Sequence, residues 1–215
     1  MSLALSLYNH HGIVMCADKM INSTFNKNCV PITICQSLTE QKLFLLDNHY
    51  GLSFTGSASI NSIPVSSMIE DYISSNALKN AHPTDWLANL VSYFQRNIHN
   101  GEHIVFTLCG YYLGEKNILT TNTSVPNNIR SITEKAGLLY SGETILLSHL
   151  VNSDLAAFDY AKFTMQDSID FLRFLIKTVS GLMHFGQMIP TVSYDCDVLA
   201  LFSNEACWIE HSELH

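Results

Sequence analysis

Apolar residues alternate with small or polar ones at the start of the chain. Leu3, Leu5 and Leu7 occupy alternate positions, the polar segment 9–12 follows, and an apolar run at 13–17 comes after it. A period of two, with a Gly-containing break between two runs, is typical of a β-hairpin. We therefore expect the chain to begin with two paired strands.

Further short apolar runs predict more strands, and the polar stretch 22–28 is expected to lead into the first of them. These runs lie at 32–35, 42–46, 50–54, 104–108, 118–121, 138–140, 198–202 and 207–209. Each is short and most are bounded by turn-forming or polar residues, as strands of a compact domain are.

Four segments have the spacing of amphipathic helices instead. They lie at 60–73, 86–98, 143–151 and 164–183. The second carries one apolar stripe and is preceded by Pro83, which favours a helix start. The last begins near Thr164, where Thr-Met-Gln-Asp resembles a capping box.

The order of these elements favours stacked antiparallel sheets. Strands, two helices, strands, two helices and strands follow one another without the strict alternation that a parallel sheet needs. Two sheets stacked between layers of helices fit this order. No repeat, linker or low-complexity segment divides the sequence, so residues 1–215 are expected to form a single domain.

Composition changes the picture by suggesting buried subunit contacts. Apolar residues make up 47% of the chain and charged residues only 14%, which indicates a thick core or an additional buried surface. We therefore expect a homo-oligomer. The net charge of −8 opposes binding to nucleic acid or to anionic lipid.

The sequence indicates a cytoplasmic protein. The start has no basic residue before its short apolar run and no cleavage-site pattern after it, and no run of 18 apolar residues occurs, so neither a signal peptide nor a membrane span is expected. Six cysteines lie without C-x-x-C spacing. They are expected to be reduced and free.

Common cofactor and metal motifs are absent from the sequence. It has no H-E-x-x-H, G-x-G-x-x-G, G-x-S-x-G or Walker loop, and the ten histidines do not gather at ligand spacing. We expect no cofactor and no metal ion.

The N-terminal residues carry a more specific pattern. A small hydroxyl residue, Ser2, precedes the alternating strand 3–8, a turn that ends at Gly12, the apolar strand 13–16 and Asp18. In this order and spacing they resemble the mature start of proteasome β subunits and their bacterial relatives, which are N-terminal nucleophile hydrolases.

Downstream segments extend this resemblance over most of the chain. The strand 42–45, led by Lys42, resembles the family's lysine-led strand, and the segment 54–59 resembles its small-residue turn into the first helix. The segment 140–142 resembles a later Ser-Gly turn. From about residue 110 onward the resemblance is loose.

The resemblance implies an α+β fold, a four-layer αββα sandwich, whose nucleophile is the first residue of the mature chain. Ser2 takes that role once Met1 is removed. A serine hydroxyl needs a base, and a chain-terminal residue carries one in its own α-amine, with a pKa near ~7.7–8.0.

The resemblance also assigns roles to four further residues. Lys42 would lower the pKa of the terminal amine by its positive charge, and Asp18 would pair with Lys42. Gly56 would donate its backbone N–H to the oxyanion. Ser141 would support the terminal amine. The alternatives are a surface lysine, a turn aspartate and ordinary glycine and serine turns.

The sequence departs from the family in two places. The family places an Asp just after the last long helix, and none is in register here; Asp195 or His184 could replace it, although Asp195 and Asp197 also fit a solvated strand edge. The segment between Asp18 and Lys42 is longer than in the family, which could reshape the substrate cleft.

The expected function is hydrolysis of amide bonds, first of all peptide bonds, through an acyl-enzyme on Ser2, as in threonine- or serine-type peptidases. The substrate would be a peptide or protein, and an unfoldase partner is open. Two alternatives remain. One is a catalytically silent, proteasome-like assembly subunit, and the other is a transpeptidase that uses the same nucleophile.

Overall fold

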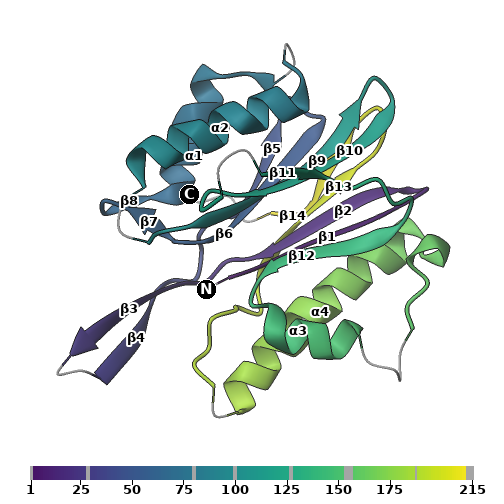
Figure 1. Ribbon diagram of the computed structural model, residues 1–215. Coiled ribbons are helices and arrows are strands. Elements are labelled where there is room, and N and C mark those ends of the chain that lie inside the picture. The colour runs from purple at the N-terminus through teal and green to yellow at the C-terminus, as the bar shows by residue number, and fades with distance from the viewer. Residues whose placement is uncertain are drawn as a thin grey trace.

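The computed structural model describes residues 2–27, 30–78, 81–98, 101–125, 128–152, 157–186 and 188–211. These residues form two five-stranded antiparallel sheets and two two-stranded ones (Figure 1). The expected strands are all present, each within a few residues of its predicted bounds.

The first large sheet contains both ends of the described chain and has the strand order β12-β1-β2-β13-β14. Its strands are β1 (Leu3–Asn9), β2 (Gly12–Asp18), β12 (Gly137–Gly142), β13 (Cys196–Leu201) and β14 (Ala206–Glu210). Strands β1 and β2 form the expected N-terminal hairpin, with Asn9 opposite Gly12.

The second large sheet has the order β11-β10-β9-β6-β5. Its strands are β5 (Leu43–Leu46), β6 (Tyr50–Gly56), β9 (Ile104–Tyr112), β10 (Glu115–Asn122) and β11 (Ile129–Ser131). Strand β6 lies between β5 and β9, and extends past the end of β5 toward the N-terminus of the chain.

The helices are α1 (Val65–Ser75), α2 (Pro83–Asn97), α3 (Thr144–Val151) and α4 (Met165–Phe185), with a short 3-10 helix, η2 (Tyr160–Lys162). Pro83 is the first residue of α2, where its missing N–H costs nothing. The predicted capping box is confirmed. The Asp167 backbone N–H donates a hydrogen bond to the Thr164 hydroxyl, and the Thr164 backbone N–H donates one to the Asp167 carboxylate.

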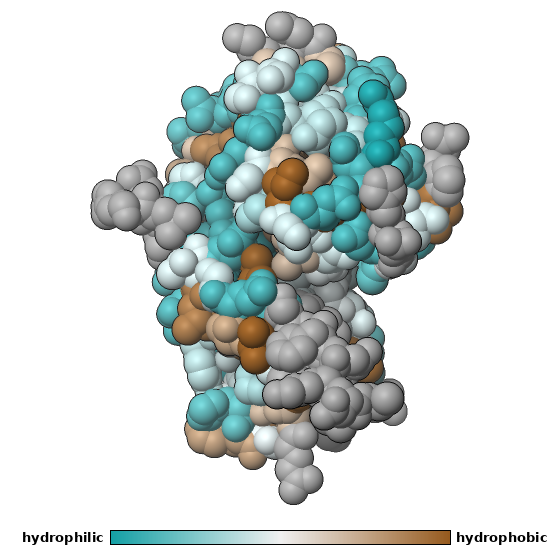
Figure 2. Space-filling model, turned by 90° about the vertical axis from the view of Figure 1, so that its left-hand side faces the viewer, coloured by the Kyte–Doolittle hydropathy of each residue, from teal (hydrophilic) through white to brown (hydrophobic). Residues whose placement is uncertain are grey.

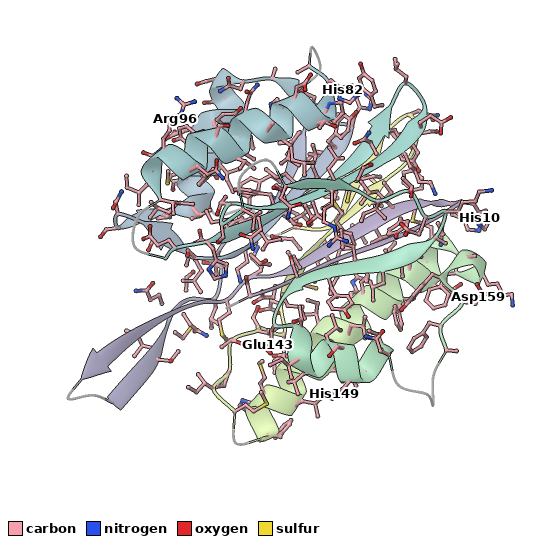
Figure 3. The ribbon with its side chains drawn as sticks, in the orientation of Figure 1. His10, His82, Arg96, Glu143, His149 and Asp159 are labelled. Carbon is pink, nitrogen blue, oxygen red and sulfur yellow. The ribbon has the colours of Figure 1, made fainter. Side chains whose placement is uncertain are left out.

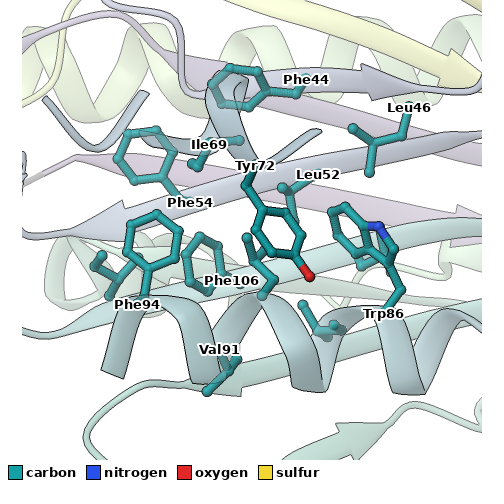
Figure 4. Packing of buried hydrophobic residues seen from close by; sticks show 14 of the residues in the cluster. Phe44, Leu46, Leu52, Phe54, Ile69, Tyr72, Trp86, Val91, Phe94 and Phe106 are labelled. Carbon is teal, nitrogen blue, oxygen red and sulfur yellow. The ribbon is translucent and has the colours of Figure 1, made fainter. Parts of the chain in front are cut away.

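Three apolar clusters hold the sheets and helices together. Helices α1 and α2 pack on the second sheet, and Figure 4 shows Phe94 of α2 beside Phe54 and Phe106 of the strands. Helices α3 and α4 pack on the first sheet. The third cluster lies between the two sheets and includes residues of β1, β2, β9 and β13.

Two additional hairpins were not expected from the sequence, although the run 32–35 did predict a strand within one of them. Strands β3 (Ile21–Lys27) and β4 (Val30–Ser37) form an arm that projects from the body beside the N-terminus (Figure 1). Strands β7 (Ser59–Ile60) and β8 (Ile63–Pro64) pair where the start of a helix was predicted. The helix begins only at Val65, because Pro64 fits the position before the first turn.

The expected fold class, an α+β four-layer αββα sandwich, is corrected by these elements. The described chain is a β-rich fold, mostly antiparallel sheet, with four α-helices. The sequence pattern underestimated the strand content because β3, β7 and β8 lack the apolar alternation by which strands are recognised.

No helix in the described ranges is long and apolar enough to cross a membrane. Cys16, Cys35, Cys109, Cys196 and Cys207 are free thiols, and Cys29 lies outside the described residues. The single domain predicted over residues 1–215 stays a prediction.

Candidate active site

Ser2 lies directly before β1, the second strand of the first sheet, and is 4% exposed. Its carbonyl accepts a 2.7 Å hydrogen bond from the backbone N–H of Glu143. Gly142, next to Glu143, has a φ of +97°, and a Cβ at that position would lie 1.8 Å from the Ser2 carbonyl oxygen. Only glycine therefore allows β12 to approach the first residues this closely.

Asp18, the last residue of β2, is fully buried and accepts four hydrogen bonds. Its Oδ1 accepts from the Leu3 N–H at 2.8 Å and from Lys42 Nζ at 2.9 Å. Its Oδ2 accepts from the backbone N–H of Met20 at 3.0 Å and of Ser193 at 3.2 Å. One carboxylate thus joins the start of β1, the lysine before β5 and the segment after α4.

Lys42 forms the ion pair that the sequence analysis expected with Asp18, and its side chain is 2% exposed. Its Nζ also donates to the Met20 carbonyl. A buried lysine needs such partners because an isolated ammonium is costly to remove from water. The backbone holds Lys42 in place through its carbonyl, which accepts from the Phe54 N–H at 3.2 Å.

Gly56 ends β6 and has a φ of +108°. The Phe54 N–H points toward Lys42, and the Ser57 N–H points the other way, to the His103 carbonyl at 2.8 Å. Successive N–H groups of a strand alternate in direction, so the Gly56 N–H points toward the side of Lys42. The glycine is required for another reason than access for substrate: a Cβ would lie 2.4 Å from the His103 carbonyl oxygen.

Ser141, in β12, lies opposite Ala4. Its hydroxyl accepts a 3.0 Å hydrogen bond from Thr55 of β6, a contact that joins the two large sheets beside Gly56. Thr55 is a neighbour that the sequence analysis did not identify.

Ser193, not Asp195 or His184, reaches Asp18 from the segment after α4. Besides its N–H bond to Asp18, the Ser193 hydroxyl accepts from the Lys19 N–H at 2.9 Å and donates to the Asp195 carbonyl at 2.7 Å. The side chains of Asp195 and His184 are exposed. A lone serine in an irregular segment carries no sequence signal of this kind, so only the fold could reveal it.

Asp197 corrects the expectation of a solvated strand edge. It is 1% exposed and accepts from Lys19 Nζ at 3.0 and 3.1 Å, and His211 Nδ1 lies 3.3 Å from its Oδ1. The His211 ring stacks on Trp208, with 4.1 Å between ring centroids. This second buried ion pair fixes Lys19 next to Asp18 in the chain.

A small cavity lies beside Ser2. It is lined by Ser2, Lys42 and Gly56, with Met20, Ile21, Asn22, Phe54 and Ala58 as further walls, and it has an accessible volume of about 10 Å³. That is about the space of one water molecule. Figure 3 labels Glu143 on this side of the molecule, where β1 begins, and His10 at the opposite end of the sheet.

The structure thus brings Ser2, Lys42 and Gly56 to one cavity, with Asp18 behind Lys42. Ser141 lies one strand away, bonded to Thr55. Such an arrangement can hold a hydroxyl, a positive charge and a backbone N–H near one reacting carbonyl. Met1, whose removal would free the amine of Ser2, lies outside the described residues.

Comparisons with known proteins define this β-rich fold further. No family model matches the chain, and no curated protein matches it in sequence. A solved structure does match: the Anbu (Gly-1) mutant from Hyphomicrobium sp. strain MC1, with a TM-score of 0.64, 16% identity, and coverage of 96% of this chain and 82% of that one. At this identity the likeness shows the fold alone.

Proposed function

We propose that this protein is an N-terminal serine hydrolase that cleaves amide bonds, first of all peptide bonds. The observation that carries the proposal is the buried Lys42–Asp18 pair: Asp18 bonds the Leu3 N–H and Lys42 at once, and Lys42 shares one cavity with Ser2. Both side chains are buried, and removing a lysine charge from water is costly. The proposed reaction gives a reason for that cost.

In the proposed reaction, the α-amine of Ser2 takes the proton of the Ser2 hydroxyl while Oγ attacks the substrate carbonyl. The Gly56 N–H donates to the oxygen that becomes negative. The C–N bond then breaks, the proton passes from the amine to the leaving nitrogen, and an ester on Ser2 remains. Water adds to that ester and releases the acid, which restores the serine. Lys42 acts through its charge, which favours the neutral form of the amine.

The test is the intact mass of the purified protein before and after treatment with a β-lactone. We expect Met1 to be absent and one adduct to form on Ser2, and we expect Ser2→Ala to form none. An adduct that persists in Ser2→Ala, or that maps to a cysteine, would show that another residue is the nucleophile.

A second candidate is a catalytically silent assembly subunit. It is favoured by one observation: Ser2 is 4% exposed and its cavity has room for about one water molecule. A protein from which Met1 is absent, yet which forms no adduct with β-lactones of several sizes, would favour this candidate over the hydrolase.

The homo-oligomer expected from composition is likewise a proposal. Its support is a set of exposed apolar residues on α3 and α4, namely Ile145, Phe174, Leu182 and Phe185. Large exposed apolar side chains become buried when subunits associate, which is favourable. Light scattering that gives the mass of a monomer across working concentrations would contradict it.

A further inference from the structure

Two larger pockets adjoin the Ser2 cavity. One, of about 400 Å³, shares Gly56 with it and is lined by Thr55, His103 and Asn122. The other, of about 430 Å³, shares Ile21 and Ala58 with it and contains Glu40; we call it the Glu40 pocket. Both volumes are in the range of about 300–1,000 Å³ that is usual for ligand sites.

Through these shared residues both larger pockets border the Ser2 cavity. In Figure 1 the N-terminus, the base of the β3–β4 arm, β7 and β8 lie on one side of the molecule, which Figure 2 shows face on. Hydrophobic residues on that face are scattered among hydrophilic ones (Figure 2).

Glu40 is the only ionisable residue among those that line the Glu40 pocket. The other polar linings are neutral: Gln36, Ser37, Ser59 and Ser62. A single carboxylate among neutral hydroxyl and amide groups favours a cation, because nothing in the lining repels one. The net charge of −8 also favours the approach of cationic molecules to the protein.

Glu40 is also held in place. Its backbone N–H donates to the Lys19 carbonyl at 3.0 Å, and its Oε1 accepts from the hydroxyl of Ser66 at the start of α1. The carboxylate is therefore fixed through one oxygen, while a carboxylate can accept several hydrogen bonds in all. A fixed carboxylate loses less entropy when it binds a cation than a mobile one does.

We propose that the Glu40 pocket binds a lysine or arginine side chain of the substrate, on the residue whose carbonyl Ser2 attacks. This inference rests on the proposed function. The pocket shares Ile21 and Ala58 with the Ser2 cavity, so a long side chain on the attacked residue can extend into the Glu40 pocket, whereas the Ser2 cavity has room for only about one water molecule.

The experiment uses the full chain after its intact mass has shown that Met1 is gone. Two short peptide amides that carry the same fluorogenic leaving group differ only at the attacked residue: one has lysine, and the other has norleucine, which lacks only the charged amine. We expect kcat/KM to be about tenfold higher for the lysine peptide, as one charge-assisted hydrogen bond allows.

Glu40→Gln keeps the shape of the side chain and its bond to Ser66 but removes the charge. We expect it to bring the ratio of the two kcat/KM values close to one, mainly by slowing the lysine peptide. Glu205→Gln, an equal change of charge at an exposed residue in the β13–β14 turn, should leave the ratio unchanged. A purely structural role for Glu40 beside α1 would instead slow both peptides equally and lower the thermal midpoint.

Either a wild-type ratio near one or an equal loss for both peptides in Glu40→Gln would overturn the proposal. A β-lactone without a side chain separates this failure from failure of the proposed function. If it labels Ser2, the hydrolase proposal stands and only the role of Glu40 is wrong. If it does not label Ser2, both proposals fall together.

Discussion

Replacing Gly142 by alanine tests whether the close approach of β12 to Ser2 matters for turnover. The added Cβ would lie 1.8 Å from the Ser2 carbonyl oxygen, whereas real Cβ atoms essentially never approach other atoms within 3.0 Å. The two must therefore separate by at least about 1.2 Å. The Cβ is bonded directly to the backbone of residue 142, and the oxygen belongs to the backbone of Ser2. Neither can turn away as a flexible side chain would, so the shift must move Ser2 or the start of α3.

The expected loss of activity follows from that displacement. A misplacement of about 1 Å at a reacting group can cost roughly a hundredfold in rate. We expect Gly142→Ala to lower kcat/KM on an amide substrate by about that factor, and to slow labelling of Ser2 by a β-lactone to a similar extent.

Gly114→Ala is the matched control. Gly114 has a φ of +84°, close to the +97° of Gly142, but a Cβ there would meet no atom within 4 Å. Both variants therefore carry the strain of an alanine at positive φ, about 1–3 kcal/mol, and only one displaces Ser2. Similar turnover in Gly142→Ala and wild type, or equal losses in the two variants, would refute the reasoning.

Three further predictions concern the ion pair, the base and a buried thiol. Lys42→Met removes the charge partner of the buried Asp18 carboxylate and leaves it with three backbone donors. The free energy of unfolding measured in urea should therefore fall by about 2–4 kcal/mol. Lys162→Met, at an exposed ion pair, should leave the urea midpoint unchanged. If the amine of Ser2 is the base, turnover should rise with pH through an apparent pKa at or below ~7.7–8.0, and a form that retains Met1 should fold equally well but be inactive; equal turnover by both forms would exclude this base. Burial raises the pKa of the Cys109 thiol to about 12, so the folded state keeps a proton that the unfolded state loses above the ordinary pKa of about 8.5. Stability should therefore fall as the pH rises between these values, and mass mapping at pH 9 should find iodoacetamide on the exposed Cys207 but not on Cys109 in the folded protein.

Much of the secondary structure could be predicted because its signals are local. The alternation at 3–8 and 13–17, the apolar stripe of α2 and the capping box at Thr164 each arise from neighbours in the chain. Strand β3 could not be predicted, because its sequence, INSTFNK, is largely polar and lacks the apolar alternation by which strands are recognised. The fold class was misjudged for the same reason.

The candidate site was only partly predictable. Ser2, Asp18, Lys42 and Gly56 could be named because they resemble a family pattern in order and spacing. Ser193 and Thr55 could not, because each reaches the site by a single hydrogen bond between segments far apart in the sequence. Asp197 was misread because its lysine partner lies 178 residues away.

The sequence by itself determined which residues could supply a hydroxyl, a buried cation and a flexible backbone, because residue type fixes chemistry. Tertiary structure alone decided that Asp18 bonds both Leu3 and Lys42, that Gly142 must lack a side chain for Ser2 to lie where it does, and that Glu40 lines a pocket beside Ser2. Those facts depend on how strands and loops distant in the chain meet at one edge of the sheets. Hydrophobic burial drives the strands together there, and a sequence pattern records which residues are buried, not which of them meet.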